Sequence, residues 1–292
     1  MRYAALASIW LLTAIQSVAA QDNRIALIIG NSDYDQNNRH TDVKDTPKDR
    51  LTDLPNGCSD AELIQSILIK LKWQDKNILF RCNASKKDII ELLEDFTQLY
   101  MSSTRPFGFI YYAGHGVQIG DSTYIFGVDT KIDIDNTISI LKNHPNGHLF
   151  KGGVRLKADI VSTLGGPGNG SLFIVLDACR ENPVAPLLRQ RSIANVSAPR
   201  KIDETTPVPG IKYLFSTAAG KLASDGAGAG NSPFALIFAQ ELAKNAKADY
   251  LIRHVVDKVY SKTLESALPQ MPDEAGTFRA PPPDACFQEC DG

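Results

Sequence analysis

The ten residues SLFIVLDACR (171–180) form an apolar run that ends in three reactive side chains. The run follows the turn-forming GNG at 168–170, and its residues 172–176 are all apolar. Short apolar runs bounded by turn signals are typical of strands buried on both faces of a parallel sheet. Ligands of open α/β sheets bind beyond the carboxyl ends of the strands. The sequence therefore places Cys179 where chemistry is expected.

A second apolar run, FGFIYYA (107–113), ends in the tripeptide GHG at 114–116. The two glycines allow a sharp turn and leave the imidazole of His115 uncovered. A cysteine thiol has an unperturbed pKa of about 8.5, so a nearby imidazole would help it to ionise. A buried structural Cys179 and a turn-capping His115 are the alternative. Two strands with such endings favour a catalytic dyad.

The motifs YYAGHG (111–116) and DACR (177–180) resemble the histidine and cysteine motifs of the caspase-like cysteine peptidases, in particular of the bacterial metacaspase-type branch, the orthocaspases. Further similar segments lie in the family's order at 24–31, 59–61, 124–129, 216–220 and 225–234. The resemblance implies an α/β fold, namely a caspase-like α/β/α sandwich with a mostly parallel central sheet covered by helices. The alternation of strand and helix signals along the chain indicates the same class.

The order of segments predicts one domain behind an export signal. Arg2, the apolar residues 4–15 and the small residues 17–20 have the layout of a signal peptide, so we expect residues 1–20 to be removed and the protein to be periplasmic or secreted. The apolar run is too short for a membrane span, and we expect none in the mature chain. The predicted peptidase domain covers 21–279, with a large part at about 21–182, a loop at 183–209 and a small part at 210–279. The proline-rich tail at 280–292 is expected to be mobile.

Local signals predict the individual elements. Capping boxes are expected at Ser59 with Glu62 and at Ser85 with Asp88, and Ser232 is expected to cap a helix that begins with Pro233. The polar segment 33–57 is expected to overhang the site or to be a disordered insertion. The remaining predicted elements are strands at 24–30, 77–82, 123–128 and 211–215, and helices at 156–164 and 249–264.

The resemblance implies a mechanism for the dyad. Cys179 would attack a peptide carbonyl as the thiolate, and His115 would help to ionise the thiol or protonate the leaving amine. The backbone N–H groups of Cys179 and Gly116 would hold the oxyanion. A peptide or protein substrate is the partner that this chemistry requires.

Two acidic residues predict the specificity. Asp177 and Asp60 match the positions that form an acidic pocket in metacaspases. Such a pocket would attract Arg or Lys and repel Asp by charge complementarity. The alternative for Asp60 is a helix-start residue that interacts with the helix dipole.

The loop that follows Cys179 is rich in proline and basic residues, which predicts an exposed segment. If the pocket accepts basic side chains, the chain carries its own cleavage sites in this loop. The candidates are Arg189, Arg191, Arg200 and Lys201.

Charge and cysteine count set further limits. A net charge of −2 gives no electrostatic reason to expect nucleic acid. Of the five cysteines, Cys58 with Cys82, or Cys286 with Cys290, could pair and spare Cys179, although connectivity cannot be deduced from sequence.

No metal or other cofactor is predicted. Asp133 and Asp135 could bind a cation, and some metacaspases depend on calcium, but two acids in a loop are more often solvated. His144 and His148 are assigned to a solvated loop, because Pro145 and Gly147 disfavour a helix there.

Two other classes of function stay open. A caspase-like domain can act as a non-catalytic protein-binding module, although both dyad residues are retained here. Another exported hydrolase, such as an esterase, is disfavoured because no Gly-x-Ser-x-Gly elbow is present. The sequence predicts no oligomeric state.

Overall fold

The structure is a computed structural model that describes residues 23–34, 51–119, 122–132, 139, 150, 152–179, 208–224, 230–278 and 285–288. Its strands are β1 Arg24–Gly30, β2 Ile78–Cys82, β3 Phe107–Ala113, β4 Gly116–Ile119, β5 Ser122–Phe126, β6 Gly153–Arg155, β7 Ser171–Asp177, β8 Ile211–Phe215 and β9 Asp273–Thr277. Its helices are α1 Gly57–Lys70, α2 Lys86–Ser102, α5 Pro233–Leu242 and α6 Ala248–Thr263, with short helical segments η1 Asp75–Asn77 and η2 Leu156–Val161.

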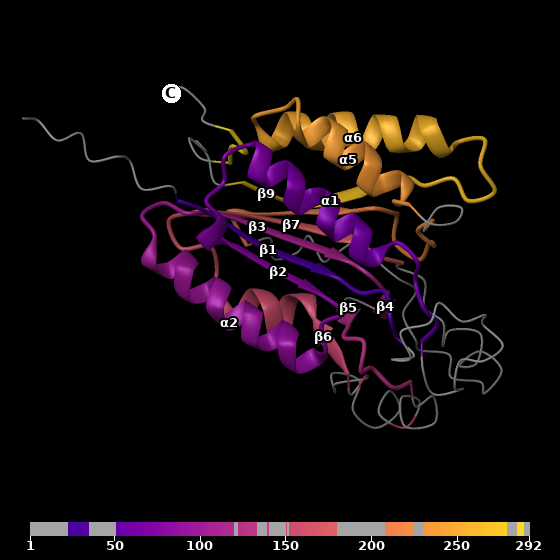
Figure 1. Ribbon diagram of the computed structural model, residues 1–292, viewed down its shortest axis with the longest axis horizontal. Helices are drawn as coiled ribbons and strands as arrows, with labels where there is room; N and C mark the ends of the chain where they lie inside the picture. Colours follow the sequence, from indigo (N-terminus) through magenta and orange to yellow (C-terminus); the bar gives the residue numbers. More distant parts are fainter. Residues whose placement is uncertain are drawn as a thin grey trace, which may run out of the picture.

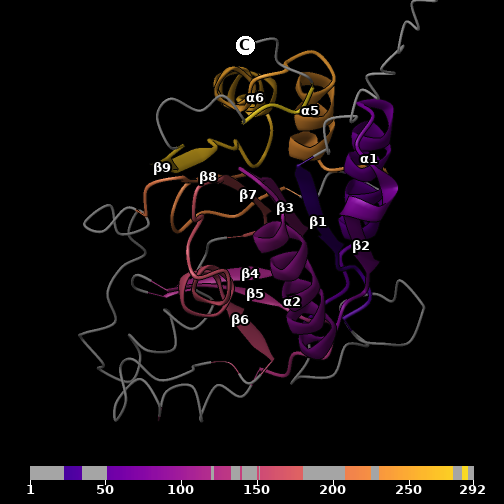
Figure 2. The same cartoon turned by 90° about the vertical axis from the view of Figure 1, so that its left-hand side faces the viewer.

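A six-stranded sheet in the order β2-β1-β3-β7-β8-β9 forms the centre of the molecule (Figures 1 and 2). All its neighbouring strands run parallel except β9, which pairs antiparallel with β8 at the edge. A smaller antiparallel sheet has the order β4-β5-β6. The predicted mixed α/β fold with a mostly parallel sheet is confirmed.

Alternation of side chains along the strands builds a separate core on each face of the sheet. Ala26 and Ile28 of β1 pack in the core that includes α1, α5 and α6. Leu27 and Ile29 point the other way and pack with α2 and η2. Figure 1 shows the same arrangement, with α1, α5 and α6 above the sheet and α2 below it. Because β1, β3 and β7 are covered on both faces, their sequences are continuous apolar runs.

Two of the three predicted helix starts are confirmed. Ser85 and Asp88 form a capping box at α2, and Ser232 accepts the N–H of Ala235 at α5. The prediction for α1 is wrong, because this helix begins at Gly57, and the hydroxyl of Ser59 donates instead to the carbonyls of Asn56 and Gly230.

The reason for the early start of α1 is a close approach of two backbones. A Cβ atom on Gly57 would lie 2.3 Å from the carbonyl oxygen of Asn31, just beyond β1. Only glycine allows the first turn of α1 to lie against the end of that strand.

The prediction of a mobile C-terminal tail is wrong for residues 285–288. Phe287 is completely buried and stacks on Trp73, with ring centroids 5.7 Å apart. Its carbonyl accepts the Trp73 indole N–H at 2.9 Å, and the backbones of Cys286 and Lys247 pair in an isolated antiparallel β-bridge. A buried aromatic side chain and backbone hydrogen bonds to residues 246–248 together hold a short segment that has no periodic pattern of its own.

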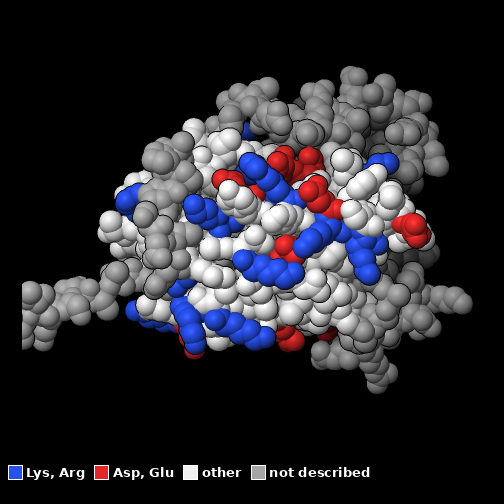
Figure 3. All heavy atoms as spheres, turned by 90° about the horizontal axis from the view of Figure 1, so that it is seen from above, with Lys and Arg blue, Asp and Glu red and all other residues white. Residues whose placement is uncertain are grey.

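The surface over α1, α5 and α6 carries charges of both signs. In Figure 3, Lys and Arg side chains are interspersed with Asp and Glu over this face, which agrees with the near-neutral net charge. In the described part of the chain, no helix has the length and apolar character needed to cross a membrane.

Candidate active site

The ends of β3 and β7 bring the histidine and cysteine segments to one edge of the sheet. Ala113 lies opposite Asp177 in the register, and the N–H of Gly114 donates to the carbonyl of Asp177 at 3.2 Å. His115 and Cys179 therefore each lie two residues beyond a paired strand position. The structure brings these two predicted residues onto adjacent loops.

Gly116 makes the close approach of these loops sterically feasible. A Cβ atom at this position would lie 2.9 Å from the Cβ of Ala178 and 3.1 Å from the carbonyl oxygen of Cys179. The backbone of the histidine segment thus packs directly against that of the cysteine segment.

Cys179 is half-buried and is not part of a disulfide. The backbone N–H of Ala223, in the segment after β8, donates to its Sγ at 3.4 Å. A donor directed at sulfur stabilises the thiolate more than the thiol.

A backbone carbonyl orients the ring of His115. The Nε2 atom lies 2.8 Å from the carbonyl oxygen of Thr52. Because a carbonyl can only accept, this bond requires the proton on Nε2 and leaves Nδ1 as the acceptor of the neutral ring. Burial lowers the pKa of His115 to about 4, so the imidazole is neutral at physiological pH.

A pocket opens beside the cysteine, and both predicted acids line it. Its wall includes Cys179, Asp177, Asp60, Gly57 and Ser232. Asp60 and Asp177 are both buried, at 2% and 7% exposure. The structure therefore gathers the predicted nucleophile and the two predicted specificity residues around one cavity.

Ser232 holds both carboxylates. Its backbone N–H donates to Oδ1 of Asp60 at 2.9 Å, and its hydroxyl donates to Oδ2 of Asp177 at 2.8 Å. Asn231 adds a side-chain donor to Oδ1 of Asp60 at 3.0 Å. These bonds offset part of the cost of placing two like charges in a buried site.

Burial raises the pKa of both carboxyl groups above the usual range, and the neighbouring Asp177 raises that of Asp60 further. Within the described ranges, no Lys or Arg forms an ion pair with either carboxylate. The pocket is therefore acidic, its carboxyl groups ionise less readily than exposed ones, and that part of the chain supplies no cationic counter-charge.

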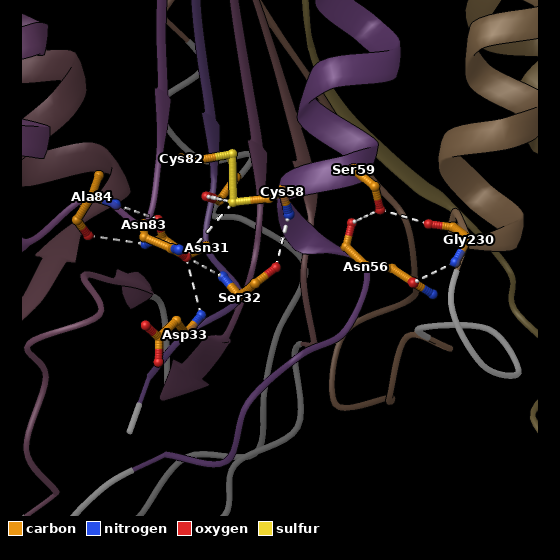
Figure 4. The surroundings of a disulfide bond; sticks show 11 residues. Asn31, Ser32, Asp33, Asn56, Cys58, Ser59, Cys82, Asn83, Ala84 and Gly230 are labelled. Carbon is orange, nitrogen blue, oxygen red and sulfur yellow. Dashed lines mark hydrogen bonds between the residues drawn. A yellow bond between two sulfur atoms is a disulfide. The ribbon is translucent and has the colours of Figure 1, made fainter. Parts of the chain in front are cut away.

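A disulfide between Cys58 and Cys82 fixes the first turn of α1 to the end of β2 (Figure 4). Around it, the hydroxyl of Ser32 accepts the N–H of Cys58 at 2.9 Å, and Oδ1 of Asn83 accepts the N–H of Ser32 at 2.9 Å. Asp60 lies on this same turn, two residues after Cys58. Cys58 with Cys82 is one of the two pairings that the sequence left open, and the structure contains it.

Other predicted positions lie outside the described residues. These are the signal segment 1–20, the loop residues Arg189, Arg191, Arg200 and Lys201, the acids Asp133 and Asp135, and the histidines His144 and His148. Cys286 is disulfide-bonded, whereas Cys290 is not described. Among the described residues, no group of three or more His, Cys, Asp or Glu is arranged to hold a metal ion.

Sequence reasoning missed two contributors to the site. Ser232 is recognisable as a helix cap, but its bonds to Asp60 and Asp177 depend on chain segments more than 50 residues away. Thr52 acts through its carbonyl, which leaves no signature in the sequence. For the polar segment 33–57 the sequence leaves open an overhang of the site or a disordered insertion; at its described end, Leu54 and Gly57 line the pocket.

Comparison with known proteins agrees with this architecture. A search of curated proteins finds no match. A family model described as the caspase domain matches residues 23–280, which include the strands of the central sheet and the residues that line the pocket. The match supports a cysteine-type peptidase. The chain therefore belongs to the caspase-domain family.

Proposed function

We propose that this protein is an exported endopeptidase that cleaves after Arg or Lys, with Cys179 as nucleophile and His115 as its proton acceptor. The observation that carries the proposal is the single cavity that joins Cys179 to two buried carboxylates, Asp60 and Asp177. A guanidinium or ammonium group would supply the cation that these carboxylates lack in the described part of the chain.

In the proposed first step, neutral His115 takes the proton of the Cys179 thiol, and Sγ bonds to the carbonyl carbon of the substrate. The pKa of about 4 keeps His115 neutral at rest and disfavours a preformed thiolate–imidazolium pair, so the proton moves as Sγ attacks. The imidazolium then gives its proton to the leaving amine as the C–N bond breaks. Water hydrolyses the acyl-enzyme and releases the acid and the free thiol.

The backbone N–H groups of Gly116 and Cys179 are the proposed oxyanion donors. The close packing of Gly116 against Cys179 supports this assignment, since Gly116 begins β4 directly after His115 and Cys179 lies two residues beyond β7 at the same edge of the sheet. Donors of this kind act where charge develops during the reaction.

The acidic pocket also supports the metacaspase-type branch within the family, and the Cys58–Cys82 disulfide supports export. Disulfides persist in oxidising compartments and are rare in the reducing cytosol. Export requires the predicted signal peptide at 1–20.

The test compares fluorogenic peptides with Arg, Lys, Asp or citrulline at the cleaved position. Citrulline has the shape of arginine without its charge. We expect hydrolysis after Arg and Lys, at least about a hundredfold slower hydrolysis after citrulline, and none after Asp.

Cys179→Ala and His115→Ala should each abolish turnover in a folded protein, and the double variant should be no worse than either single one. Preference for Asp would refute the acidic pocket. A folded wild type without Cys179-dependent hydrolysis would instead favour the non-catalytic binding module.

A further inference from the structure

Two buried tyrosine hydroxyls connect the two backbone polar groups of His115 in a closed chain of hydrogen bonds. The N–H of His115 donates to the hydroxyl of Tyr34 at 2.8 Å. The hydroxyls of Tyr34 and Tyr112 lie 3.1 Å apart, and that of Tyr112 donates to the carbonyl of His115 at 2.8 Å. Both rings are fully buried.

The direction of the protons follows from the available donors. Each phenol has a single proton. If Tyr34 gives its proton to Tyr112, then Tyr112 can give its own to a carbonyl, and every bond in the ring has one donor and one acceptor. The backbone of Phe126 also meets this hydroxyl: its N–H donates to it at 3.2 Å, and its carbonyl lies 2.8 Å away, so the single proton of Tyr112 is shared between the carbonyls of His115 and Phe126. With that proton directed to His115, the chain is one-directional and polarises each of its bonds in the same sense.

Tyr34 also acts on the imidazole itself. Its ring packs edge-on against that of His115, with centroids 4.6 Å apart. Its backbone N–H donates to the carboxylate of Asp53 at 2.8 Å, and the carbonyl of the preceding Thr52 holds Nε2 of His115. Tyr34 therefore connects the backbone of His115 to the segment that orients its ring.

The space around the two hydroxyls admits no side chain. A Cβ atom on Gly114 would lie 2.5 Å from the hydroxyl oxygen of Tyr112 and 2.6 Å from that of Tyr34. Burial raises the pKa of both phenols, so both remain protonated donors at any working pH.

We propose that Tyr34 and Tyr112 are positioning residues that act through His115 and keep its imidazole in the geometry that proton transfer from Cys179 requires. This proposal rests on the proposed function, because it assigns His115 as the base. Without the two hydroxyls, the backbone N–H and carbonyl of His115 would lose these partners, and the residue that carries the imidazole would be less restrained. A displacement of about 1 Å at a catalytic group can lower a rate roughly a hundredfold.

The test uses Tyr34→Phe and Tyr112→Phe, each of which removes one oxygen and keeps the ring. With an Arg substrate we expect kcat to fall about ten- to a hundredfold while KM stays within about twofold, since the pocket acids are untouched. The double variant should be no slower than the slower single variant, because either change breaks the same chain of hydrogen bonds.

Tyr100→Phe is the matched control. Tyr100 is equally buried and donates to the carbonyl of Pro167 at 3.0 Å from α2. The Tyr100→Phe protein should lose about as much thermal stability as Tyr34→Phe and Tyr112→Phe, with no change in kcat. If Tyr34→Phe and Tyr112→Phe are folded and keep kcat within about twofold of wild type, or lose no more than Tyr100→Phe, the proposal is wrong.

The rate of Cys179 alkylation by iodoacetamide gives a readout that does not depend on peptide cleavage. In wild type, coupling to His115 should raise this rate near neutral pH, and both tyrosine variants should shift its pH profile towards that of His115→Ala. Absence of peptide hydrolysis by wild type would refute the proposed function. An unchanged alkylation profile in the tyrosine variants would refute the positioning role separately.

Discussion

At the scale of single residues, Asp60 combines a functional requirement with a cost in stability. Its carboxyl group is 2% exposed, and both burial and the adjacent Asp177 raise its pKa. A carboxyl group whose pKa is higher in the folded state than in the unfolded state lowers stability once it ionises. This loss is complete above the folded-state pKa and vanishes below the unfolded-state value of about 4.

Asp60→Asn should therefore stabilise the protein at neutral and mildly alkaline pH while it weakens cleavage after Arg. An asparagine oxygen can still accept the bonds from Asn231 and Ser232, so the fold around it is retained. We expect a Tm above that of wild type at pH 8, with a difference that shrinks towards pH 4, and a fall of about tenfold or more in kcat/KM for Arg substrates.

Asp257→Asn, at an exposed position on α6, is the control and should change neither quantity. An Asp60→Asn protein that is less stable than wild type at pH 8 would contradict the raised pKa of Asp60.

The sequence could predict the residues proposed to carry the chemistry, because a thiol, an imidazole and one carboxylate follow apolar runs and a second carboxylate stands at the start of a helix. It could not predict their supporting partners. Thr52 acts through a carbonyl that every residue has, and Ser232 has a sufficient local explanation as the cap of α5. Tyr34 looks like an ordinary polar-segment residue until the fold places it beside His115.

At the scale of elements, the first turn of α1 is held from two sides. The Cys58–Cys82 disulfide ties it to β2, and Asn56 and Ser59 bond to Gly230 just before α5 (Figure 4). Asp60 is thus positioned by the element that carries it as well as by its own hydrogen bonds.

Replacement of both cysteines, Cys58→Ser with Cys82→Ser, should loosen this turn. Because the disulfide spans 24 residues, its loss should cost roughly 3 kcal/mol of stability. We expect KM for Arg substrates to rise about threefold or more with a smaller change in kcat, measured by steady-state kinetics beside thermal unfolding.

Cys286→Ser is the control, because it removes a disulfide far from the pocket. Cys286 lies next to Phe287, whose carbonyl accepts a hydrogen bond from Arg24 at the first residue of β1. This change should lower stability and leave KM unchanged. Equal KM values in wild type, in the Cys58→Ser/Cys82→Ser double variant and in Cys286→Ser would show that the Cys58–Cys82 disulfide does not help to shape the pocket.

The elements differ in how far the sequence could predict them. β1 and β3 have the predicted bounds because continuous apolar runs identify strands that are covered on both faces. β9, with the sequence DEAGT, lies at the sheet edge and has no apolar pattern, so it was not predicted. β4 was missed as well, since four residues directly after His115 are too few to show an alternation.

At the scale of the whole molecule, the order of the central strands decides what a cut in the chain would do. β7 and β8 are neighbours and pair in parallel from Leu172 with Ile211 to Leu176 with Phe215. The loop at 183–209 joins them, so cleavage within it would separate the chain into two parts that still share a sheet and both cores.

We predict that the active protein cuts itself in this loop after Arg189, Arg191, Arg200 or Lys201. Basic residues in a proline-rich segment offer the extended backbone that a peptidase binds, and an acidic pocket would accept their side chains. Denaturing electrophoresis and mass spectrometry should find a larger N-terminal and a smaller C-terminal fragment, whereas size-exclusion chromatography should find one particle.

Purified Cys179→Ala should stay intact, and added wild type would reveal cleavage in trans. A variant with all four basic residues changed to Gln should also stay intact while it retains the fold. Wild type that remains uncut while active, or Cys179→Ala that is cut at the same sites when pure, would refute self-cleavage.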